Sequence, residues 1–245
     1  MKILFCDIES SAIEALVWGR YEINTAKVTR ESELISAAWR FRGGAIDSEC
    51  RKNGKRGSDK KVAKRFWKAL DEADIVIGHN VTKFDRRKAN TFFAKYGLGP
   101  PSSYQIVDTL KVTKANFVLS SYKLDDVCEY FGLGKKLKHP GIDMWDDCMK
   151  GDKAALEMME KYNRHDVVLA EALYDFLLPW VNNHPNVALM TQRPNTCPNC
   201  GSDRFKSRGI GYTKTQAYRR YQCTDCRRQF RGQGTIKGMK KPGVC

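Results

Sequence analysis

The 245-residue sequence contains no long hydrophobic segment. No apolar run approaches the roughly 20 residues that a membrane-spanning helix requires, so a membrane-spanning helical protein is not expected. The first residues are strand-like and lack the layout of a secretory signal peptide. We therefore expect an intracellular protein, cytoplasmic or nucleoid-associated, with no membrane partner.

The C-terminal part of the sequence has few acidic residues. Residues 191–245 contain 13 Lys or Arg against only Asp203 and Asp225, a net charge of +11. The preceding 190 residues carry the remaining +4 of the total of +15. A near-neutral body with a strongly basic end indicates a nucleic-acid partner. The alternative is a surface that is simply basic and soluble.

Paired cysteines stand out in a chain for which no oxidising compartment is indicated. Cys197 and Cys200 form one C-x2-C pair, Cys223 and Cys226 form another, and 22 residues separate the pairs. Such spacing indicates metal rather than disulfides. It is typical of a zinc ribbon, in which four thiolates close a tetrahedral structural site for one Zn²⁺. A module of about 50 mostly polar residues should not fold without that metal.

Internal repeats are absent, and strand and helix patterns alternate instead. Strands are predicted at residues 2–8, 33–41, 45–50, 74–80 and 104–110, and helices at residues 58–73, 84–97, 122–134 and 152–180. Ser58 is the predicted N-cap of the first helix, and Gly43-Gly44 indicates a hairpin. Paired strands followed by alternating strands and helices indicate an α/β fold with a mixed sheet.

The predicted domain organisation has four parts. Residues 1–181 should form the main domain, and residues 182–195, with two prolines and four asparagines, a linker. The zinc ribbon is expected over residues 196–235, followed by a basic tail at residues 236–245.

Two carboxylates follow the first predicted strand in the segment "LFCDIESS". Asp7 and Glu9 are two residues apart, so both point to the same face of that strand. Side by side at the end of an apolar run, they repel each other and lose hydration. A shared cation would offset both effects.

Other carboxylates could share that cation. Asp85 in "NVTKFD" follows the strand predicted at residues 74–80. Asp166 in "YNRHD" lies on a predicted helix, one turn after Tyr162 and on the same face. Four converging carboxylates suit two Mg²⁺ or Mn²⁺ ions about 3.5–4 Å apart, which clamp the attacking and leaving oxygens of a phosphodiester.

These segments resemble the motifs of the DEDD superfamily of ribonuclease H-like 3′–5′ exonucleases, and especially the exonuclease domain of family B DNA polymerases. "FCDIES", "GHNVTKFD", "YNRHD" and the stretch "SSYKLDDVCEYFGLGKK" carry the resemblance, which covers roughly residues 1–180. It implies a ribonuclease H-like mixed sheet flanked by helices, α/β in class. The catalytic residues that it implies are Asp7, Glu9, Asp85, Tyr162 and Asp166, with Asn80 holding the terminal nucleotide or the loop.

The segment "YNRHD", which resembles the third motif of the family, indicates the subclass. A tyrosine with three residues between it and the last aspartate is typical of one branch, and Tyr162 matches it. The other branch has histidine one position earlier, where this chain has Lys161. His165 fits neither pattern and is interpreted as an ordinary histidine on or near the surface.

Each metal ligand has an expected role. Asp7 should bridge both cations, Glu9 and Asp166 should hold the cation nearer the attacking water, and Asp85 should lie on the side of the leaving 3′ oxygen. Tyr162, with an ordinary pKa near ~10, is better suited to orient the water than to act as a base. No metal role is expected for two other acidic groups: Asp125 and Asp126 on a solvated helix face, and Asp143, Asp146 and Asp147 in a loop-like stretch.

The function expected is a free-standing 3′–5′ exonuclease acting on single-stranded or frayed DNA. The alternatives are an RNA exonuclease of the same fold and a non-catalytic nucleic-acid-binding protein on a decayed nuclease fold.

The ribbon could bind nucleic acid through basic residues and the aromatic residues Tyr212, Tyr218, Tyr221 and Phe230. It could instead use those aromatic residues as its own core, or recruit the chain to replication or repair proteins.

Overall fold

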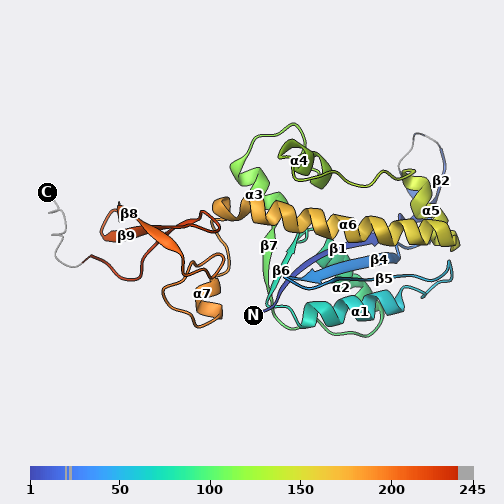
Figure 1. The fold of residues 1–245 in the computed structure, drawn as a ribbon. Helices are drawn as coiled ribbons and strands as arrows, with labels where there is room; N and C mark the ends of the chain where they lie inside the picture. Colours follow the sequence, from blue (N-terminus) through green and yellow to red (C-terminus); the bar gives the residue numbers. More distant parts are fainter. Residues whose placement is uncertain (20, 22–23, 237–245) are drawn as a thin grey trace. The chain divides into compact units, whose positions relative to one another are not determined.

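The computed structural model describes residues 1–19, 21 and 24–236 (Figure 1). The chain divides into two compact units, an N-terminal unit of residues 2–173 and a C-terminal unit that begins at Tyr174. Apart from Ile236, the predicted basic tail lies outside the described residues. Within the described ranges, no helix combines the length and the apolar character needed to cross a membrane.

A five-stranded mixed sheet forms the centre of the N-terminal unit. Its strands, in spatial order, are β5 (Ile46–Cys50), β4 (Leu34–Phe41), β1 (Ile3–Ser10), β6 (Ile75–Gly78) and β7 (Gln105–Asp108). β4 runs antiparallel to both β1 and β5, whereas β6 is parallel to β1 and to β7. The predicted mixed sheet is confirmed, including the hairpin between β4 and β5.

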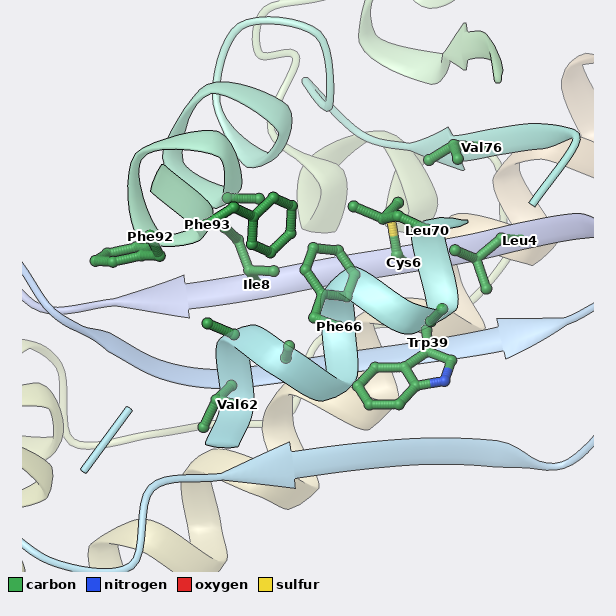
Figure 2. Close-up of a cluster of buried hydrophobic side chains, with 14 of the residues drawn as sticks. Leu4, Cys6, Ile8, Trp39, Val62, Phe66, Leu70, Val76, Phe92 and Phe93 are labelled. Atoms are coloured by element: carbon green, nitrogen blue, oxygen red, sulfur yellow. The ribbon is translucent and has the colours of Figure 1, made fainter. Parts of the chain in front are cut away.

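Helices cover both faces of the sheet (Figure 1). They are α1 (Lys60–Asp71), α2 (Asp85–Lys95), α3 (Thr109–Asn116), α4 (Leu124–Tyr130), α5 (Ile142–Lys150) and α6 (Lys153–Leu177), and a hairpin of β2 (Glu14–Val17) and β3 (Thr25–Arg30) follows β1. On one face, Phe66 of α1 and Phe93 of α2 pack against Leu4, Cys6 and Ile8 of β1 (Figure 2). This cluster is the main hydrophobic core.

The other face of β1 carries the charged residues. Because side chains alternate along a strand, Asp7 and Glu9 point away from the core that holds Cys6 and Ile8. Their partners on β4 are small, since Asp7 pairs with Ala38 and Glu9 with Ser36. Small neighbours leave room above the two carboxylates for side chains from α6.

Three local predictions were wrong. The strand predicted at residues 104–110 ends at Asp108, because the Asp108 side chain accepts from the N–H groups of Leu110 and Lys111 and caps α3. Ser58 is not the N-cap of α1, since its hydroxyl donates to the carbonyl of Asn53 and Asp59 occupies the cap position. The stretch of Asp143, Asp146 and Asp147 is not a loop but helix α5, which buries Met144, Cys148 and Met149.

The C-terminal unit begins well before the predicted ribbon. It contains a 3₁₀ turn (Leu178–Trp180), α7 (Val187–Met190) and a three-stranded antiparallel sheet of β8 (Phe205–Tyr212), β9 (Ala217–Cys223) and β10 (Gln229–Arg231). α7 lies inside the segment expected to be a linker. Val187 N–H donates to Pro198 O at 2.8 Å, and Asn199 Nδ2 donates to Leu178 O at 3.2 Å. Val187, inside the predicted linker, therefore contacts the segment of the first cysteine pair.

Candidate active site

Three carboxylates from two distant parts of the sequence meet in the N-terminal unit. Oxygen atoms of Asp7, Glu9 and Asp166 lie within 4.8 Å of one another. β1 supplies Asp7 and Glu9, and α6 supplies Asp166, which is only 1% exposed. The first strand and the last long helix predicted from the sequence, β1 and α6, thus bring these acidic groups together.

The fourth predicted carboxylate lies beside this group, outside the set that meets within 4.8 Å. Asp85 is the first residue of α2 and is buried. Its Oδ1 accepts a hydrogen bond from Ile8 N–H at 3.1 Å. The paired residues of β1 and β6 end at Phe5 and Ile77, so Ile8 N–H needs another acceptor on that edge. This bond places Asp85 next to β1, between Asp7 and Glu9 along the strand.

Burial and mutual repulsion favour the protonated forms of these carboxyl groups. Loss of hydration raises the pKa of Glu9 to about 7, with the charge of Asp166 adding to the effect. Burial likewise raises the pKa of Asp85 to about 7, although the hydrogen bond from Ile8 opposes the shift. The pKa of Asp7 lies well above its ordinary value because of burial and the charges of Asp85, Asp166 and Glu9. A cation in the cluster would relieve each of these penalties.

The donor set fits hard divalent cations. Oδ1 of Asp166 is buried and, among the described residues, has no hydrogen-bond partner. A buried carboxylate oxygen without a partner is costly unless something else is bound to it. Carboxylate oxygens are also the ligands that Mg²⁺ and Mn²⁺ prefer. The group could therefore hold metal, with Asp166 Oδ1 as one free ligand position.

Lys136 is the main charged residue that sequence reasoning missed. Its ammonium group pairs with Asp166 Oδ2 and donates to Tyr162 Oη at 2.9 Å. Two further contacts fix the segment that carries it: Asp125 Oδ1 accepts from Lys136 N–H at 2.6 Å, and the His165 ring contacts Lys135 O at 2.7 Å. The available signal was the Lys-Lys pair that ends the stretch "SSYKLDDVCEYFGLGKK".

Aromatic side chains border the carboxylates. Tyr162 is buried, and burial with the neighbouring Asp166 charge raises its pKa to about 12. Trp145 of α5 donates its indole N–H to Glu9 Oε2 at 3.2 Å. The ring of His139 lies 5.0 Å from both the Trp145 and the Tyr162 rings. Sequence reasoning missed Trp145 because its segment was assigned to a loop.

Asn163 links the sheet to the helix beneath the site. Its Nδ2 donates to Asp7 Oδ2 at 2.6 Å, and its Oδ1 accepts from Ser36 Oγ at 2.9 Å. Asn163 and its bond with Ser36 are fully buried, and its bond with the half-buried Asp7 is partly so. They fix the orientation of the Asp7 carboxylate.

Asn80 lies in the turn between β6 and α2. Its backbone has a φ of 68°, in the left-handed region that asparagine tolerates better than most residues. Its N–H donates to Asp108 Oδ1 at 3.0 Å, and Thr82 N–H donates to Asp108 Oδ2 at 3.1 Å. Asp108 therefore shapes the turn that leads to Asp85.

The four paired cysteines form a second candidate metal centre, in the C-terminal unit. Their sulfur atoms lie within 4.8 Å of one another, and none is in a disulfide. The distances Cys197 Sγ–Cys226 Sγ and Cys200 Sγ–Cys223 Sγ are both 3.6 Å. Tetrahedral zinc with Zn–S bonds of about 2.3 Å would separate the sulfurs by about 3.8 Å. The arrangement thus fits a four-thiolate metal site.

Comparisons with known proteins agree with this architecture. A family model described as the RNase H superfamily matches residues 21–178. Among solved structures, the family B DNA polymerase from the hyperthermophilic archaeon Pyrobaculum calidifontis is similar, with a TM-score of 0.54 and 19% sequence identity. The similarity covers 73% of this chain but only 24% of the polymerase chain. No curated protein matches. The predicted ribonuclease H-like fold and its likeness to family B polymerases are confirmed.

Proposed function

The chain belongs to the RNase H superfamily, and on this premise we propose that it is a metal-dependent 3′–5′ exonuclease. Its proposed substrate is the 3′ end of single-stranded or frayed DNA, of which it hydrolyses phosphodiester bonds. The observation that carries the proposal is the meeting of Asp7, Glu9 and Asp166 within 4.8 Å. Half-buried and buried carboxylates that repel one another serve no evident structural purpose without cations.

Two Mg²⁺ or Mn²⁺ ions are the proposed cofactors at this site. Asp7, Glu9, Asp85 and Asp166 would hold these ions. When bound, such ions neutralise the charge of the phosphate and lower the pKa of the attacking water. The raised pKa values of Glu9 and Asp85 and the unpartnered Asp166 Oδ1 support this assignment.

The chain's own residues orient the groups that react. Tyr162 keeps its proton at neutral pH, because its pKa is raised to about 12. Its hydroxyl can therefore direct the attacking water but does not serve as a base. Asn163 fixes the Asp7 carboxylate, and Trp145 fixes Glu9 through a single hydrogen bond. We assign Asn80, in the turn next to Asp85, to the terminal nucleotide.

A non-catalytic role on a decayed nuclease fold is the rival proposal. Decay would remove the selection for a buried group of acidic residues, which is unfavourable on its own. The retention of all four carboxylates with Tyr162 supports catalysis. An RNA substrate remains the second enzymatic candidate, and the experiment below separates it from DNA.

In the C-terminal unit, we assign one structural Zn²⁺ to Cys197, Cys200, Cys223 and Cys226. Four thiolates leave no open position for a reacting water, so this metal would support the fold. The ribbon that it holds is proposed to bind nucleic acid. Recruitment to replication or repair proteins inside the cell is the alternative role for the ribbon.

Cleavage of end-labelled oligonucleotides tests the proposal. Single-stranded DNA and RNA of the same sequence, labelled at either end, are incubated with Mg²⁺, with Mn²⁺ or without divalent metal. A 3′–5′ exonuclease releases a 3′ label as a mononucleotide at once and shortens a 5′-labelled strand into a ladder. Circular single-stranded DNA and the Asp166→Ala protein are the controls. Cutting of the circle, or release of a 5′ label first, would contradict the proposal.

A further inference from the structure

The two faces of the C-terminal sheet differ sharply in chemistry. Paired residues of neighbouring strands lie on the same face of a sheet, so the register shows which side chains share each face. Phe205 pairs with Cys223, Ser207 with Tyr221 and Phe230 with Tyr221, which places these residues on one face. The opposite face carries Lys206, Arg208, Tyr218, Arg220, Gln222 and Arg231.

The aromatic face is the small core of the unit. The rings of Phe205, Tyr221 and Phe230 lie 5.1, 5.5 and 5.8 Å apart in pairs, at angles that include two edge contacts. Each ring is half-buried against the others. These rings therefore stabilise the unit through their mutual packing, whereas Tyr218 lies on the other side of the sheet.

The opposite face is a cluster of four cations, here called the basic face: Lys206, Arg208, Arg220 and Arg231. All four are exposed, and the face includes no carboxylate. Among the described residues of the C-terminal unit, the ion pair of the sheet region joins Arg204 to Asp225, which are not on this face. The basic face thus presents uncompensated positive charge.

Local contacts order three of these cations, the arginines. The Arg208 guanidinium donates through Nε to Gln222 Oε1 at 2.8 Å. The Arg231 guanidinium stacks over the Tyr218 ring at 4.9 Å. A Cβ at Gly211 would lie 2.7 Å from Arg220 Cδ, so the absence of a side chain there lets the Arg220 stem lie across the sheet. Pre-ordered guanidinium groups lose less entropy when they bind an anion.

We propose that the basic face binds the phosphate backbone of one nucleic-acid strand, with a base stacking beside Tyr218 and Arg231. This inference rests on the proposed function and assigns the ribbon's part in it to four residues. Alternate residues of a strand lie about 6.8 Å apart, the scale of the spacing between successive phosphates in an extended strand. Arginine with a half-buried tyrosine is a combination suited to phosphates and bases together.

The test compares two full-length proteins that each lack three positive charges. One carries Arg208→Gln, Arg220→Gln and Arg231→Gln on the basic face, and the control carries the same change at three other arginines of the unit, Arg193, Arg219 and Arg227. Binding of a fluorescent single-stranded oligonucleotide is followed by anisotropy, without divalent metal and over a range of salt. Zinc content and melting temperature confirm that both variants are folded.

We expect the basic-face variant to bind up to about 100-fold more weakly at 0.1 M salt, with a salt slope reduced by about 2, since each lost contact with a single strand removes about 0.7. The control variant should lose only a few-fold. Tyr218→Ala should weaken binding further, and the exposed Tyr212→Ala should not. Equal losses in the two triple variants, or equal binding of poly-glutamate and the oligonucleotide, would overturn the proposal. Binding is measured apart from cleavage, so an inactive but tightly binding protein would refute the exonuclease and leave this inference standing.

Discussion

The ammonium group of Lys136 donates a hydrogen bond of 2.9 Å to the hydroxyl oxygen of Tyr162. The oxygen is thus the acceptor of this bond, and the tyrosine's own proton is free to be donated. The same ammonium group pairs with Asp166, so one cation from the segment after α4 joins two residues of α6. Tyr162 is therefore held as a hydrogen-bond donor at the edge of the carboxylate cluster.

Replacing Tyr162 with phenylalanine should slow cleavage without abolishing it. The ring still packs against His139 and Trp145, but the hydroxyl that we propose orients the water is lost. We expect a loss of ~10- to 1,000-fold in single-turnover rate, because the carboxylates and their cations remain. Tyr122→Phe, which removes a hydroxyl that contacts Phe117 O, is the matched control. An unchanged rate in Tyr162→Phe would remove this tyrosine from the site.

Replacing Lys136 with methionine should destabilise the protein when divalent metal is absent. Burial lowers the pKa of this lysine, but the Asp166 charge and the hydrogen bonds to Asp166 and Tyr162 together outweigh burial and raise the pKa, so the ammonium partly neutralises the cluster. Without it, the melting temperature should fall, and the gain on adding Mn²⁺ should exceed that of the unmodified protein. Lys135→Met is the control, because Lys135 pairs with Glu129 on the exposed surface. Equal metal-induced gains in both variants would contradict this role.

Removing one carboxylate should separate catalysis from folding. Asp7→Ala should reduce cleavage to the level of buffer while nucleic-acid binding stays nearly intact. Because one of several repelling charges is gone, the metal-free melting temperature should hold or rise. Asp146→Ala, which removes an exposed aspartate paired with Lys150, should leave cleavage unchanged. Robust cleavage by the Asp7→Ala protein would refute the proposed mechanism.

The carboxylates could be predicted because their positions depend on local patterns. Asp7 and Glu9 end an apolar strand, Asp85 follows another, and Asp166 lies one turn from Tyr162. The residues that hold them could not be predicted in this way. Trp145 reaches Glu9 across 136 residues, and its stretch contains three aspartates that obscured the apolar side of α5.

Other misses have similar physical causes. The hairpin of β2 and β3 has no buried face, so its sequence lacks the alternation that marks a half-buried strand. The predicted strand extends into the first two residues of α3, because the start of this helix depends on capping by Asp108 and not on a hydrophobic pattern. The segment of residues 182–195 has the composition of a linker, yet it packs through contacts such as Val187 with Pro198. The composition of a segment shows how polar it is, but not which of its backbone groups form hydrogen bonds with the rest of the fold.

The effect of metal on stability should depend on pH. In the folded protein the pKa values of Glu9 and Asp85 are raised to about 7, against about 4 in an unfolded chain. Between pH 4 and pH 7 the folded state binds more protons than the unfolded state, so the free energy of unfolding without metal should fall as pH rises from about 4 to 7. Divalent ions replace the lost protons, and their stabilising effect should grow by several degrees between pH 5 and pH 8. Thermal unfolding with and without Mg²⁺ measures this, and a gain independent of pH would contradict it. Glu9→Gln should flatten the dependence.

Loss of zinc should disable the ribbon without disabling the nuclease chemistry. Cys197 is fully buried, and its sulfur lies 3.6 Å from that of Cys226, so Cys197→Ser removes one of the four thiolates of this site. We expect zinc content to fall from one ion per chain to near zero, because structural sites depend on all their ligands. The turnover rate at saturating oligonucleotide should stay close to that of the unmodified protein, since the carboxylates all lie in the N-terminal unit. The oligonucleotide concentration needed for saturation should rise, because the basic face would no longer be ordered.

Cys50→Ser, at a half-buried cysteine whose thiol contacts Leu156 O, controls for the chemical change alone. Retention of a full zinc ion by Cys197→Ser would refute the four-thiolate site. A collapse of turnover at saturation would show instead that the ribbon takes part in the chemical step.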